Sequence, residues 1–270
     1  MTKIRSFLKW AGSKYNCLDK IIPFLPSGKR LIEPFAGSGA VFMNTHYSIH
    51  LLAESNLDLV NLFTCLQKEG EQFIKFCQKY FKPETNNKEL YYQIRADFNQ
   101  SAYNRQRAAF FLYLNRHGYN GLCRYNSKGG YNVPFGQYIK PYFPVNEMKL
   151  FHAKSQTAEF LHQDFRKTFE YAERGDVIYC DPPYVPLRET TNLLPYTNKL
   201  FTTEDQIELT ELAKETAAKG IPVILSNHDT AFTRHYYRKA KIKSFPVARF
   251  INCQGNLRKP AKELIAIFNR

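Results

Sequence analysis

The sequence has few of the features that mark a secreted, membrane-embedded or metal-binding protein. Its six cysteines are scattered with no CxxC pair, so neither a disulfide framework nor a thiolate metal site is indicated. No apolar run approaches the roughly 20 residues of a membrane-spanning helix, and the N-terminus lacks the apolar core of a secretory signal. No HExxH-type motif or His/Cys cluster indicates a metal. We therefore expect a cytoplasmic protein with reduced thiols and no bound metal.

Acidic residues are also in short supply. There are 24 of them against 38 lysines and arginines, which gives a formal net charge of +14. Because such an excess of positive charge attracts polyanions, the composition favours a nucleic-acid partner, although a solvated basic surface would give the same count. Hydrophobic residues make up 44% of the 270 residues, enough for one large domain or one domain with an insertion.

Strand-like and helix-like segments alternate at both ends of the chain. The apolar runs with strand character are RLIE, IHLLAES, AEFLHQDF, DVIYC and IPVILSNHD. The segment 201–220 is typical of an amphipathic helix, with a capping signature at Thr203 and Gln206 and a stop at Gly220. The last segments, IKSFPVARFI and KELIAIFN, predict an antiparallel pair that closes the sheet. The alternation predicts an α/β fold with a doubly wound, largely parallel, Rossmann-like sheet.

Residues 57–145 have a different texture and predict an insertion into this fold. Helical patterns dominate its first part, and a stretch rich in Gly, Asn and Tyr follows. The turn dipeptides Asn120-Gly121 and Gly129-Gly130 suit a β-hairpin or an ordered loop. We therefore predict a helical insertion that ends in a hairpin, between catalytic segments 1–56 and 146–270.

The second half of the insertion has the composition of a nucleic-acid contact. Residues 101–140 contain six basic residues and no acidic residue, and tyrosines are interleaved with them. Positive charge among aromatic and amide groups suits contact with phosphates and bases. We expect two of these tyrosines, Tyr103 and Tyr113, to belong to a helix core instead.

The stretch VIYCDPPY ends a strand abruptly at a carboxylate. Prolines fix φ and supply no backbone donor, so the strand must stop at Asp181, and Cys180 is expected to pack inside it. An exocyclic amine on an aromatic base is a poor nucleophile because its lone pair is delocalised into the ring. The Asp181 carboxylate and the Pro182 carbonyl can each accept one N–H from such an amine, Pro183 stiffens the turn, and Tyr184 offers a face for stacking. The motif therefore predicts methyl transfer to an amino group.

A glycine turn and an acid predict a nucleotide-like cofactor. In EPFAGSG, Gly37 and Gly39 let the backbone approach a ligand closely, and Glu33 can accept a hydrogen bond. Glu54 ends the next strand about 20 residues on, where an acid binds ribose hydroxyls in dinucleotide folds. An ordinary glycine turn would explain the first feature alone, but the combination favours a cofactor that contains adenosine.

These segments also carry a family resemblance that covers essentially the whole chain. FLKWAGSK, EPFAGSG and DPPY, in this order, resemble the adenine-N6 DNA methyltransferases of the alpha order. NRHGYNGLCRYN, NVPFGQYIKPYFP and LSNHDT narrow the resemblance to the Dam DNA adenine methyltransferase family. The resemblance implies S-adenosyl-L-methionine as cofactor, double-stranded DNA containing GATC as substrate, flipping of the adenine and direct transfer to its N6. It also implies a monomer that is associated with the nucleoid.

The resemblance implies roles for individual residues. The implied cofactor-binding residues are Trp10, Lys14, Phe35, Gly37, Ser38, Gly39, Glu54, Asp164 and Asp181. The implied catalytic residues are Asp181, Pro182, Pro183 and Tyr184. The implied contacts to DNA lie in a target-recognition domain at 57–145, with the exception of Lys9. Lys9 and Arg124 are implied to read the guanines, and Tyr119 and Asn120 to lie at the gap left by the flipped base. Leu122 and Pro134 are implied to contact thymine, and Tyr138 to support them.

Some alternatives stay open at the level of sequence. Methylation of RNA adenine or of cytosine N4 is a rival within enzymes, although asparagine in place of Asp181 would favour the cytosine branch more strongly. A DNA-binding protein without catalytic activity is a rival of another class, but DPPY would then have no purpose. Asn227, His228 and Asp229 end a strand near the predicted site, where they either support it through hydrogen bonds or take part directly.

Overall fold

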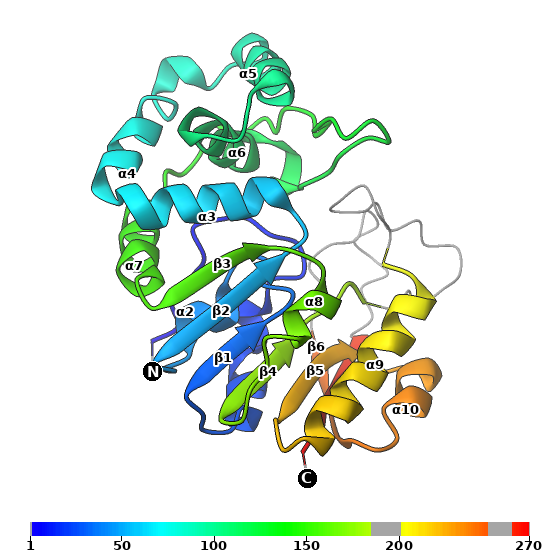
Figure 1. Cartoon of the computed structure of the whole chain (residues 1–270). Helices are drawn as coiled ribbons and strands as arrows, with labels where there is room; N and C mark the ends of the chain where they lie inside the picture. Colours follow the sequence, from blue (N-terminus) through cyan, green and yellow to red (C-terminus); the bar gives the residue numbers. More distant parts are fainter. Residues whose placement is uncertain (1, 185–200, 248–260, 270) are drawn as a thin grey trace.

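A seven-stranded sheet forms the centre of the protein. The computed structural model describes residues 2–184, 201–247 and 261–269 (Figure 1). The sheet has the order β3-β2-β1-β4-β5-β7-β6. The strands are β1 (Arg30–Glu33), β2 (Ile49–Glu54), β3 (Ala158–His162), β4 (Asp176–Cys180), β5 (Val223–His228), β6 (Lys241–Val247) and β7 (Ala261–Phe268). Strands β1 to β5 pair in parallel, and β7 is antiparallel to β5 and β6.

This arrangement confirms the doubly wound parallel sheet and the antiparallel pair predicted at its end. Residues 248–251 of the segment IKSFPVARFI lie outside the described residues. The chain runs from β1 outward to β2 and β3, and then returns to place β4 on the other side of β1. Strand order therefore reverses between β1 and β4, where Arg30 is in register with Asp176. Ligands of open α/β sheets bind at the carboxyl ends of strands at such a point.

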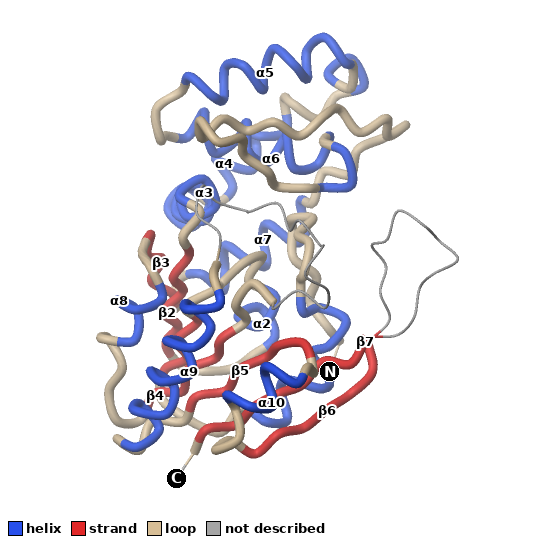
Figure 2. The backbone as a smooth tube through the Cα atoms, turned by 90° about the vertical axis from the view of Figure 1, so that its right-hand side faces the viewer, coloured by secondary structure: helices blue, strands red, loops and turns tan. Residues whose placement is uncertain are grey.

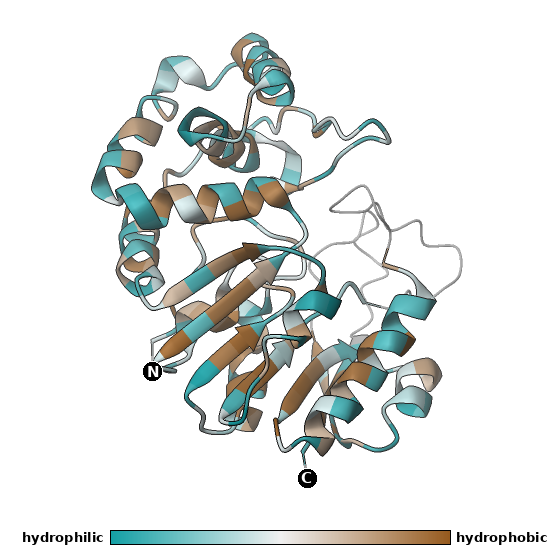
Figure 3. Ribbon diagram, in the orientation of Figure 1, coloured by the Kyte–Doolittle hydropathy of each residue, from teal (hydrophilic) through white to brown (hydrophobic). Residues whose placement is uncertain are grey.

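Alternating residues of the central strands cover the two faces of the sheet with separate hydrophobic clusters. Leu31 and Val177 pack on one face, and their neighbours Ile32 and Ile178 pack on the other. The first face is covered by the short helices η1 (Lys14–Cys17), α1 (Leu18–Ile21), η2 (Ile22–Phe24) and α2 (Ala40–Asn44). The second is covered by α8 (Phe165–Phe169), α9 (Thr203–Ala218) and α10 (Ala231–Tyr236). Figure 3 shows the apolar residues concentrated along the strands between these layers.

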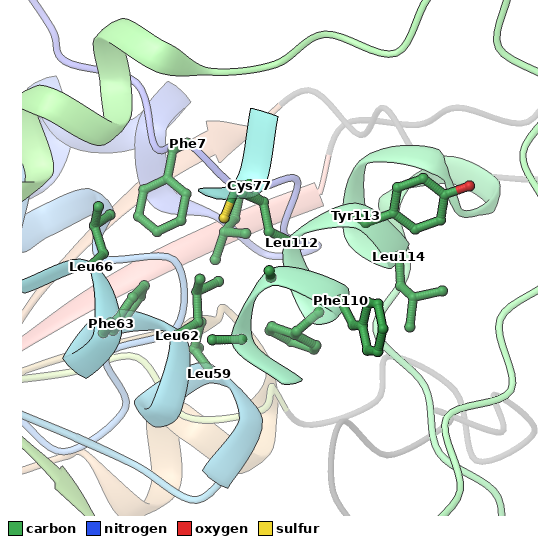
Figure 4. Packing of buried hydrophobic residues seen from close by; sticks show 14 of the residues in the cluster. Phe7, Leu59, Leu62, Phe63, Leu66, Cys77, Phe110, Leu112, Tyr113 and Leu114 are labelled. Atoms are coloured by element: carbon green, nitrogen blue, oxygen red, sulfur yellow. The ribbon is translucent and has the colours of Figure 1, made fainter. Parts of the chain in front are cut away.

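The insertion forms a helical layer above the β3 edge of the sheet (Figure 1). Its helices are α3 (Leu57–Glu69), α4 (Glu71–Gln78), η3 (Pro83–Thr85), α5 (Lys88–Gln100) and α6 (Arg105–His117), and α7 (Val145–Ser155) leads back to β3. One hydrophobic cluster is shared by both parts: Phe7 lies beside Leu62 and Phe63 of α3, and Leu112 of α6 lies close by (Figure 4). This shared core fixes the helical layer against the sheet.

The capping residue of α9 differs from the predicted one. Its N-cap is Thr202, whose hydroxyl accepts a hydrogen bond from the Asp205 backbone N–H at 3.2 Å, while the Asp205 carboxylate accepts from the Thr202 backbone N–H at 2.7 Å. The expected pair of Thr203 and Gln206 is thus wrong by one residue, because Asp205 makes the reciprocal bond and Gln206 points into the interior. The predicted stop is confirmed, since α9 ends two residues before Gly220.

The two tyrosines assigned to a helix core have different environments. Tyr113 of α6 is fully buried, as expected, but Tyr103 is 52% exposed, so that expectation is wrong. Tyr103 lies between the end of α5 and Asn104, the N-cap of α6, where no helix face directs it inward. Its ring instead covers the guanidinium of Arg107, whose Cζ lies 4.4 Å from the ring centroid.

The Gly- and Tyr-rich stretch folds back on itself after α6 (Figure 2). Isolated antiparallel bridges join Gly118 to Phe135 and Tyr125 to Tyr131. The Asn126 side chain closes the turn by accepting hydrogen bonds from two backbone N–H groups at 126–130. Of the two alternatives left open by the turn dipeptides, this is an ordered, hairpin-like loop held by isolated bridges; we call residues 118–138 the recognition loop.

A buried ion pair ties the recognition loop to the helical layer. The Arg107 Nε of α6 donates to Asp58 Oδ1 of α3 at 2.5 Å, and both side chains are almost fully buried. The Tyr125 hydroxyl of the loop donates to the other oxygen of Asp58 at 2.6 Å. Removing one partner of a buried pair leaves an uncompensated charge, which is costly in a medium of low polarity.

We therefore expect Asp58→Ala to lower the free energy of unfolding by about 3–5 kcal/mol, as measured by urea denaturation. The matched control is Glu71→Ala, which removes the exposed Lys149–Glu71 pair. Since exposed pairs contribute little, this control should lose no more than about 1 kcal/mol. Equal losses in the two variants would show that the buried pair does not hold the loop.

Candidate active site

The N-terminal segment meets the glycine turn that follows β1. A Cβ atom at Gly37 would lie 3.2 Å from the indole Nε1 of Trp10, so the ring covers this glycine closely. The hydroxyls of Ser38 and Ser13 are 3.2 Å apart, and the Ser6 hydroxyl donates to the Ser38 carbonyl at 2.8 Å. Residues of the predicted cofactor set that are far apart in the sequence, such as Trp10 and Gly37, are thus brought together where strand order reverses.

Glu54 holds the glycine turn from the end of β2. Its Oε2 accepts a hydrogen bond from the Gly37 backbone N–H, and its Oε1 accepts one from the Asn56 backbone N–H, both at 3.1 Å. Gly37 and Gly39 have φ values of 48° and 70°, which only glycine adopts without strain. Burial raises the pKa of Glu54, against these hydrogen bonds, which favour the carboxylate. A carboxylate has about four acceptor positions, so a ligand hydroxyl can be bound as well.

The Asp181 carboxylate follows β4 directly and is compensated from two sides. Its Oδ1 lies 2.9 Å from the ammonium of Lys14 and accepts a hydrogen bond from the Ser226 hydroxyl at 2.8 Å. Lys14 also donates to the Gly12 carbonyl at 2.9 Å. Ser226 lies on β5, and its hydroxyl is 2.9 Å from that of Tyr179. These contacts fix the direction of a side chain that is 19% exposed.

Tyr184 is held by three side chains around its ring. Its hydroxyl donates to Glu263 Oε2 at 3.2 Å, and the His228 ring packs against it at a steep angle, with the two ring centroids 4.7 Å apart. The Lys14 ammonium lies 4.5 Å from the same centroid. Burial, with the Asp181 and Glu263 carboxylates, raises the pKa of Tyr184, so the phenol stays neutral. Three elements, η1, β5 and β7, therefore position this ring next to Asp181.

Phe35 and Asp164 lie at the same end of the sheet. Phe35 stacks on Phe165 of α8 with centroids 5.4 Å apart. Asp164 is the N-cap of α8 and accepts a hydrogen bond from the Arg166 backbone N–H at 2.9 Å. Phe35 follows β1 and Asp164 follows β3, so both lie at the carboxyl end of the parallel strands, two strands apart in the sheet.

A second group of predicted residues gathers between the N-terminal segment and the recognition loop. The Asn115 side chain accepts a hydrogen bond from the Lys9 backbone N–H at 2.9 Å and donates one to the Lys9 carbonyl at 2.7 Å. The Lys9 ammonium lies 3.6 Å from the ring centroid of Tyr138, and burial, with Arg116, lowers the pKa of Lys9 to about 8. Asn120 has the left-handed φ of 52°, and its neighbour Tyr119 is 52% exposed.

The remaining loop residues lie along the two antiparallel segments. The Arg124 guanidinium donates to the side-chain and backbone oxygens of Asn132 at 2.7 and 3.0 Å. The carbonyl of Leu122 accepts from the Tyr131 hydroxyl at 3.0 Å, and that of Pro134 accepts from the Tyr119 backbone N–H at 2.9 Å. Asn132 thus aligns Arg124 across the loop.

Sequence reasoning missed three residues that contact the DPPY turn. They are Ser226, which binds Asp181, Gln206, which binds Pro183, and Glu263, which binds Tyr184. Ser226 could have been found from register, because Cys180 pairs with Leu225 and the next positions along both strands are therefore neighbours. Of the three residues predicted to end this strand, Asn227 donates to Gln206, His228 packs on Tyr184, and Asp229 accepts from Arg234 of α10.

Two classes of site receive no support from the residues that the structure describes. In residues 2–184, 201–247 and 261–269, no group of three or more His, Cys, Asp or Glu side chains is placed to hold a metal ion. Within the same ranges, the helices are too short or too polar to cross a membrane.

Glu33 is a carboxyl group buried beneath this site. It ends β1, is 3% exposed, and its Oε1 has no hydrogen-bond partner among the described residues. Burial, followed by the nearby Asp181 carboxylate, raises the pKa of Glu33 to about 8, although Lys154 opposes the shift. At pH values between the ordinary pKa of a glutamate and this raised one, the Glu33 carboxyl is therefore neutral in the folded protein, whereas it is ionised in the unfolded chain.

The sequence is similar to those of known proteins over nearly its whole length. A family model described as D12 class N6 adenine-specific DNA methyltransferase matches residues 10–249. The chain is 46% identical over 268 residues to the DNA adenine methylase of Escherichia coli (strain K12), covering 99% of this chain and 96% of that one. It is 47% identical over 269 residues to the DNA adenine methylase of Vibrio cholerae serotype O1, covering 99% and 97%. For the Serratia marcescens DNA adenine methylase, the identity is 44% over 269 residues, covering 99% and 100%.

The buried Glu33 predicts a pH dependence of stability. Because its pKa lies near 8 in the folded protein and near 4.5 when unfolded, the folded state binds the extra proton and loses stability as pH rises between these values. We expect Glu33→Gln to remove this loss, so its stability relative to the wild type rises by on the order of 1–3 kcal/mol across the window. Urea denaturation at several pH values measures the effect, and Glu159→Gln, at an exposed position, is the control. An unchanged pH slope in Glu33→Gln would contradict the assignment.

Proposed function

This chain belongs to the D12 class of N6 adenine-specific DNA methyltransferases, and we propose that it transfers a methyl group from S-adenosyl-L-methionine to adenine N6 in double-stranded GATC. Methylation of DNA adenine is the activity of the family; the donor, the target sequence and the flipped base are the proposal. The observation that carries it is the position of the DPPY turn beside the glycine turn, with Asp181 fixed by Lys14 and Ser226.

The chemistry at the amino group follows from the orientation of Asp181. Both contacts to the carboxylate use Oδ1, and we assign Oδ2 to accept one N–H of the adenine amino group. The Pro182 carbonyl accepts the second N–H, so that the nitrogen lone pair is directed away from the ring. The N–C bond then forms as the S–C bond of the donor breaks, S-adenosylhomocysteine leaves, and the extra proton on N6 passes to solvent. No covalent enzyme intermediate is needed.

The residues around the glycine turn fit the proposed cofactor. S-adenosyl-L-methionine supplies an activated methyl group on its sulfonium. The turn exposes backbone at Gly37 and Gly39, and Glu54 can bind a ribose hydroxyl while holding that turn. Trp10, which covers Gly37, and Phe35 provide aromatic surface, and Ser38, Asp164 and Lys14 supply polar groups at this end of the sheet.

Flipping brings adenine to Asp181 at a cost of a few kcal/mol of stacking and pairing. Tyr184 is held with its ring beside Asp181, where the base can stack on it. Tyr119, half exposed at the recognition loop next to Asn120, is placed to fill the gap in the duplex. Stacking at these two tyrosines offsets part of the cost.

We assign the target-recognition domain to residues 57–145, with Lys9 from the N-terminal segment added to it. Arg124 presents a planar fork that matches guanine O6 and N7 in the major groove, and Lys9 reads the guanine at the other edge. Leu122 and Pro134 contact thymine, and Tyr138 supports Lys9 through the ring-to-ammonium contact. We propose that the enzyme acts as a monomer.

The proposed reaction is tested by comparing the wild type with Asp181→Ala in a host that lacks adenine methylation. DNA from cells with the wild type should resist a GATC nuclease that methylation blocks, and DNA from cells with the variant should be cut. In vitro, the variant should lose at least about 100-fold in methyl transfer, because it lacks the group that directs N6. Its DNA affinity should change little, since the phosphate contacts lie elsewhere. Asp19→Asn, an exposed acid, is the control. If DNA from cells with the wild-type enzyme were cut as readily as DNA from cells with the variant, GATC would be ruled out as the target.

The recognition of guanine is tested with Arg124→Ala and Lys128→Ala. Arg124→Ala should narrow the preference for GATC over sites altered at one guanine by roughly 1–3 kcal/mol, as measured by turnover on each single-base variant at fixed salt. Lys128 is exposed on the same loop, and its loss should slow all sequences alike and reduce the salt dependence. If Arg124→Ala also slows all sites by one factor, Arg124 contacts only phosphate.

A further inference from the structure

The DPPY turn has too few backbone donors to be held in place by its own hydrogen bonds. Pro182 and Pro183 have no backbone N–H, so neither can donate the hydrogen bonds that usually close a turn. The turn nevertheless presents two carbonyl groups, and the proposed reaction requires that of Pro182 to point in one direction. Donors from other elements must therefore fix this segment.

Gln206 supplies one such donor from the first turns of α9. Its Nε2 donates to the Pro183 carbonyl at 2.5 Å, and its Oε1 accepts a hydrogen bond from Asn227 Nδ2 at 3.1 Å. Gln206 is 3% exposed, although a glutamine on a helix that covers a sheet is usually on the solvent side. A side-chain amide is the group that can donate at one end and accept at the other.

Asn227 of β5 sets the orientation of this amide. Its Oδ1 accepts a hydrogen bond from the His228 backbone N–H at 2.8 Å, and its Nδ2 also lies 3.0 Å from the Tyr237 hydroxyl. Because a backbone N–H can only donate, the Asn227 oxygen must face it and the Asn227 nitrogen must face Gln206. Gln206 then has to turn its own nitrogen toward Pro183. The backbone of β5 thus determines the direction of the hydrogen bonds that run from Asn227 through Gln206 to Pro183.

Asn227 and Ser226 hold the turn from opposite faces of the sheet. Successive side chains of a strand alternate in direction, so Ser226 points toward Tyr179 and Asp181, and Asn227 points toward α9. The first fixes the carboxylate, and the second, through Gln206, fixes the Pro183 carbonyl. Since the ring of Pro183 locks its φ, holding the carbonyl of Pro183 also restricts the peptide plane that carries the Pro182 carbonyl.

We propose that Gln206 is a positioning residue for methyl transfer, which directs the Pro182 carbonyl at the amino group by holding the Pro183 carbonyl, and that Asn227 fixes the direction of its amide. The inference rests on the proposed function, in which that carbonyl accepts an N–H of adenine. Gln206 itself touches neither substrate nor cofactor in this assignment.

The test replaces Gln206 by Met, which has a similar length and no hydrogen-bonding amide. The single-turnover rate of methyl transfer from S-adenosyl-L-methionine to GATC duplex should fall by about 10-fold to 100-fold, because a small misplacement of a catalytic group costs this much. The dissociation constants for cofactor and duplex should stay within about twofold of the wild type, since the binding residues lie elsewhere. The matched control is Thr210→Val, one turn further along α9, which removes a fully buried hydrogen bond to the Gln206 carbonyl without touching the turn. Its rate should remain that of the wild type.

A second variant separates positioning from folding. Gln206→Glu keeps the volume, and its neutral acid can donate an O–H to the Pro183 carbonyl, whereas its carboxylate cannot. Its rate relative to the wild type should therefore rise by about tenfold as pH is lowered from about 8 to about 6. Wild-type incorporation of methyl groups tests the proposed function by itself, and the ratio of variant to wild type tests the role of Gln206. A Gln206→Met rate equal to that of an active wild type, or equal losses in rate and in binding, would overturn the inference, as would a flat pH profile of the ratio for Gln206→Glu.

Discussion

A negative charge at the end of a wholly buried strand is the constraint on which the arrangement of this protein depends. All five residues of β4 are buried, and Asp181 follows directly. An isolated carboxylate in such a place is costly unless it is paired and hydrogen-bonded. The Lys14 ammonium and the Ser226 hydroxyl meet this requirement from an N-terminal segment and from β5. The DPPY turn, proposed above as the catalytic turn, is therefore complete only when these distant parts of the chain are assembled around it.

The N-terminal segment connects the parts of the site. Lys9 is bound through its backbone to Asn115 in the helical layer, Trp10 covers the glycine turn at Gly37, and Lys14 reaches Asp181. Only a few residues of chain thus separate the proposed contacts to DNA, to cofactor and to the reacting amine. The arrangement provides a physical route by which recognition of DNA can affect the geometry of the reaction.

The sequence predicts the strands and the grouping of the site better than its supporting contacts. The strands follow from apolar runs that end at polar residues, and the carboxyl ends of parallel strands necessarily meet at one edge. The position of the α9 cap did not follow, because Thr202 and Thr203 are adjacent and both are followed three residues later by a side chain that can cap. The contact of Ser226 with Asp181 depends on the register of β4 with β5, and the burial of Gln206 depends on the packing of α9 against Asn227 and Pro183; a local pattern contains neither.

The pairing of β1 with β4 has a consequence for synthesis of the protein. Arg30 is in register with Asp176, so the central pair of strands cannot form until the whole helical insertion has left the ribosome. Ser226 emerges later still, and at 5–20 residues per second the chain waits about 10–40 s between β1 and the residue that binds the Asp181 carboxylate. Until β3 and β4 emerge, β1 and β2 each have one edge with unpaired backbone groups, and loops of this length close slowly. The nascent chain is therefore most exposed to aggregation and to chaperones before β4 and β5 emerge.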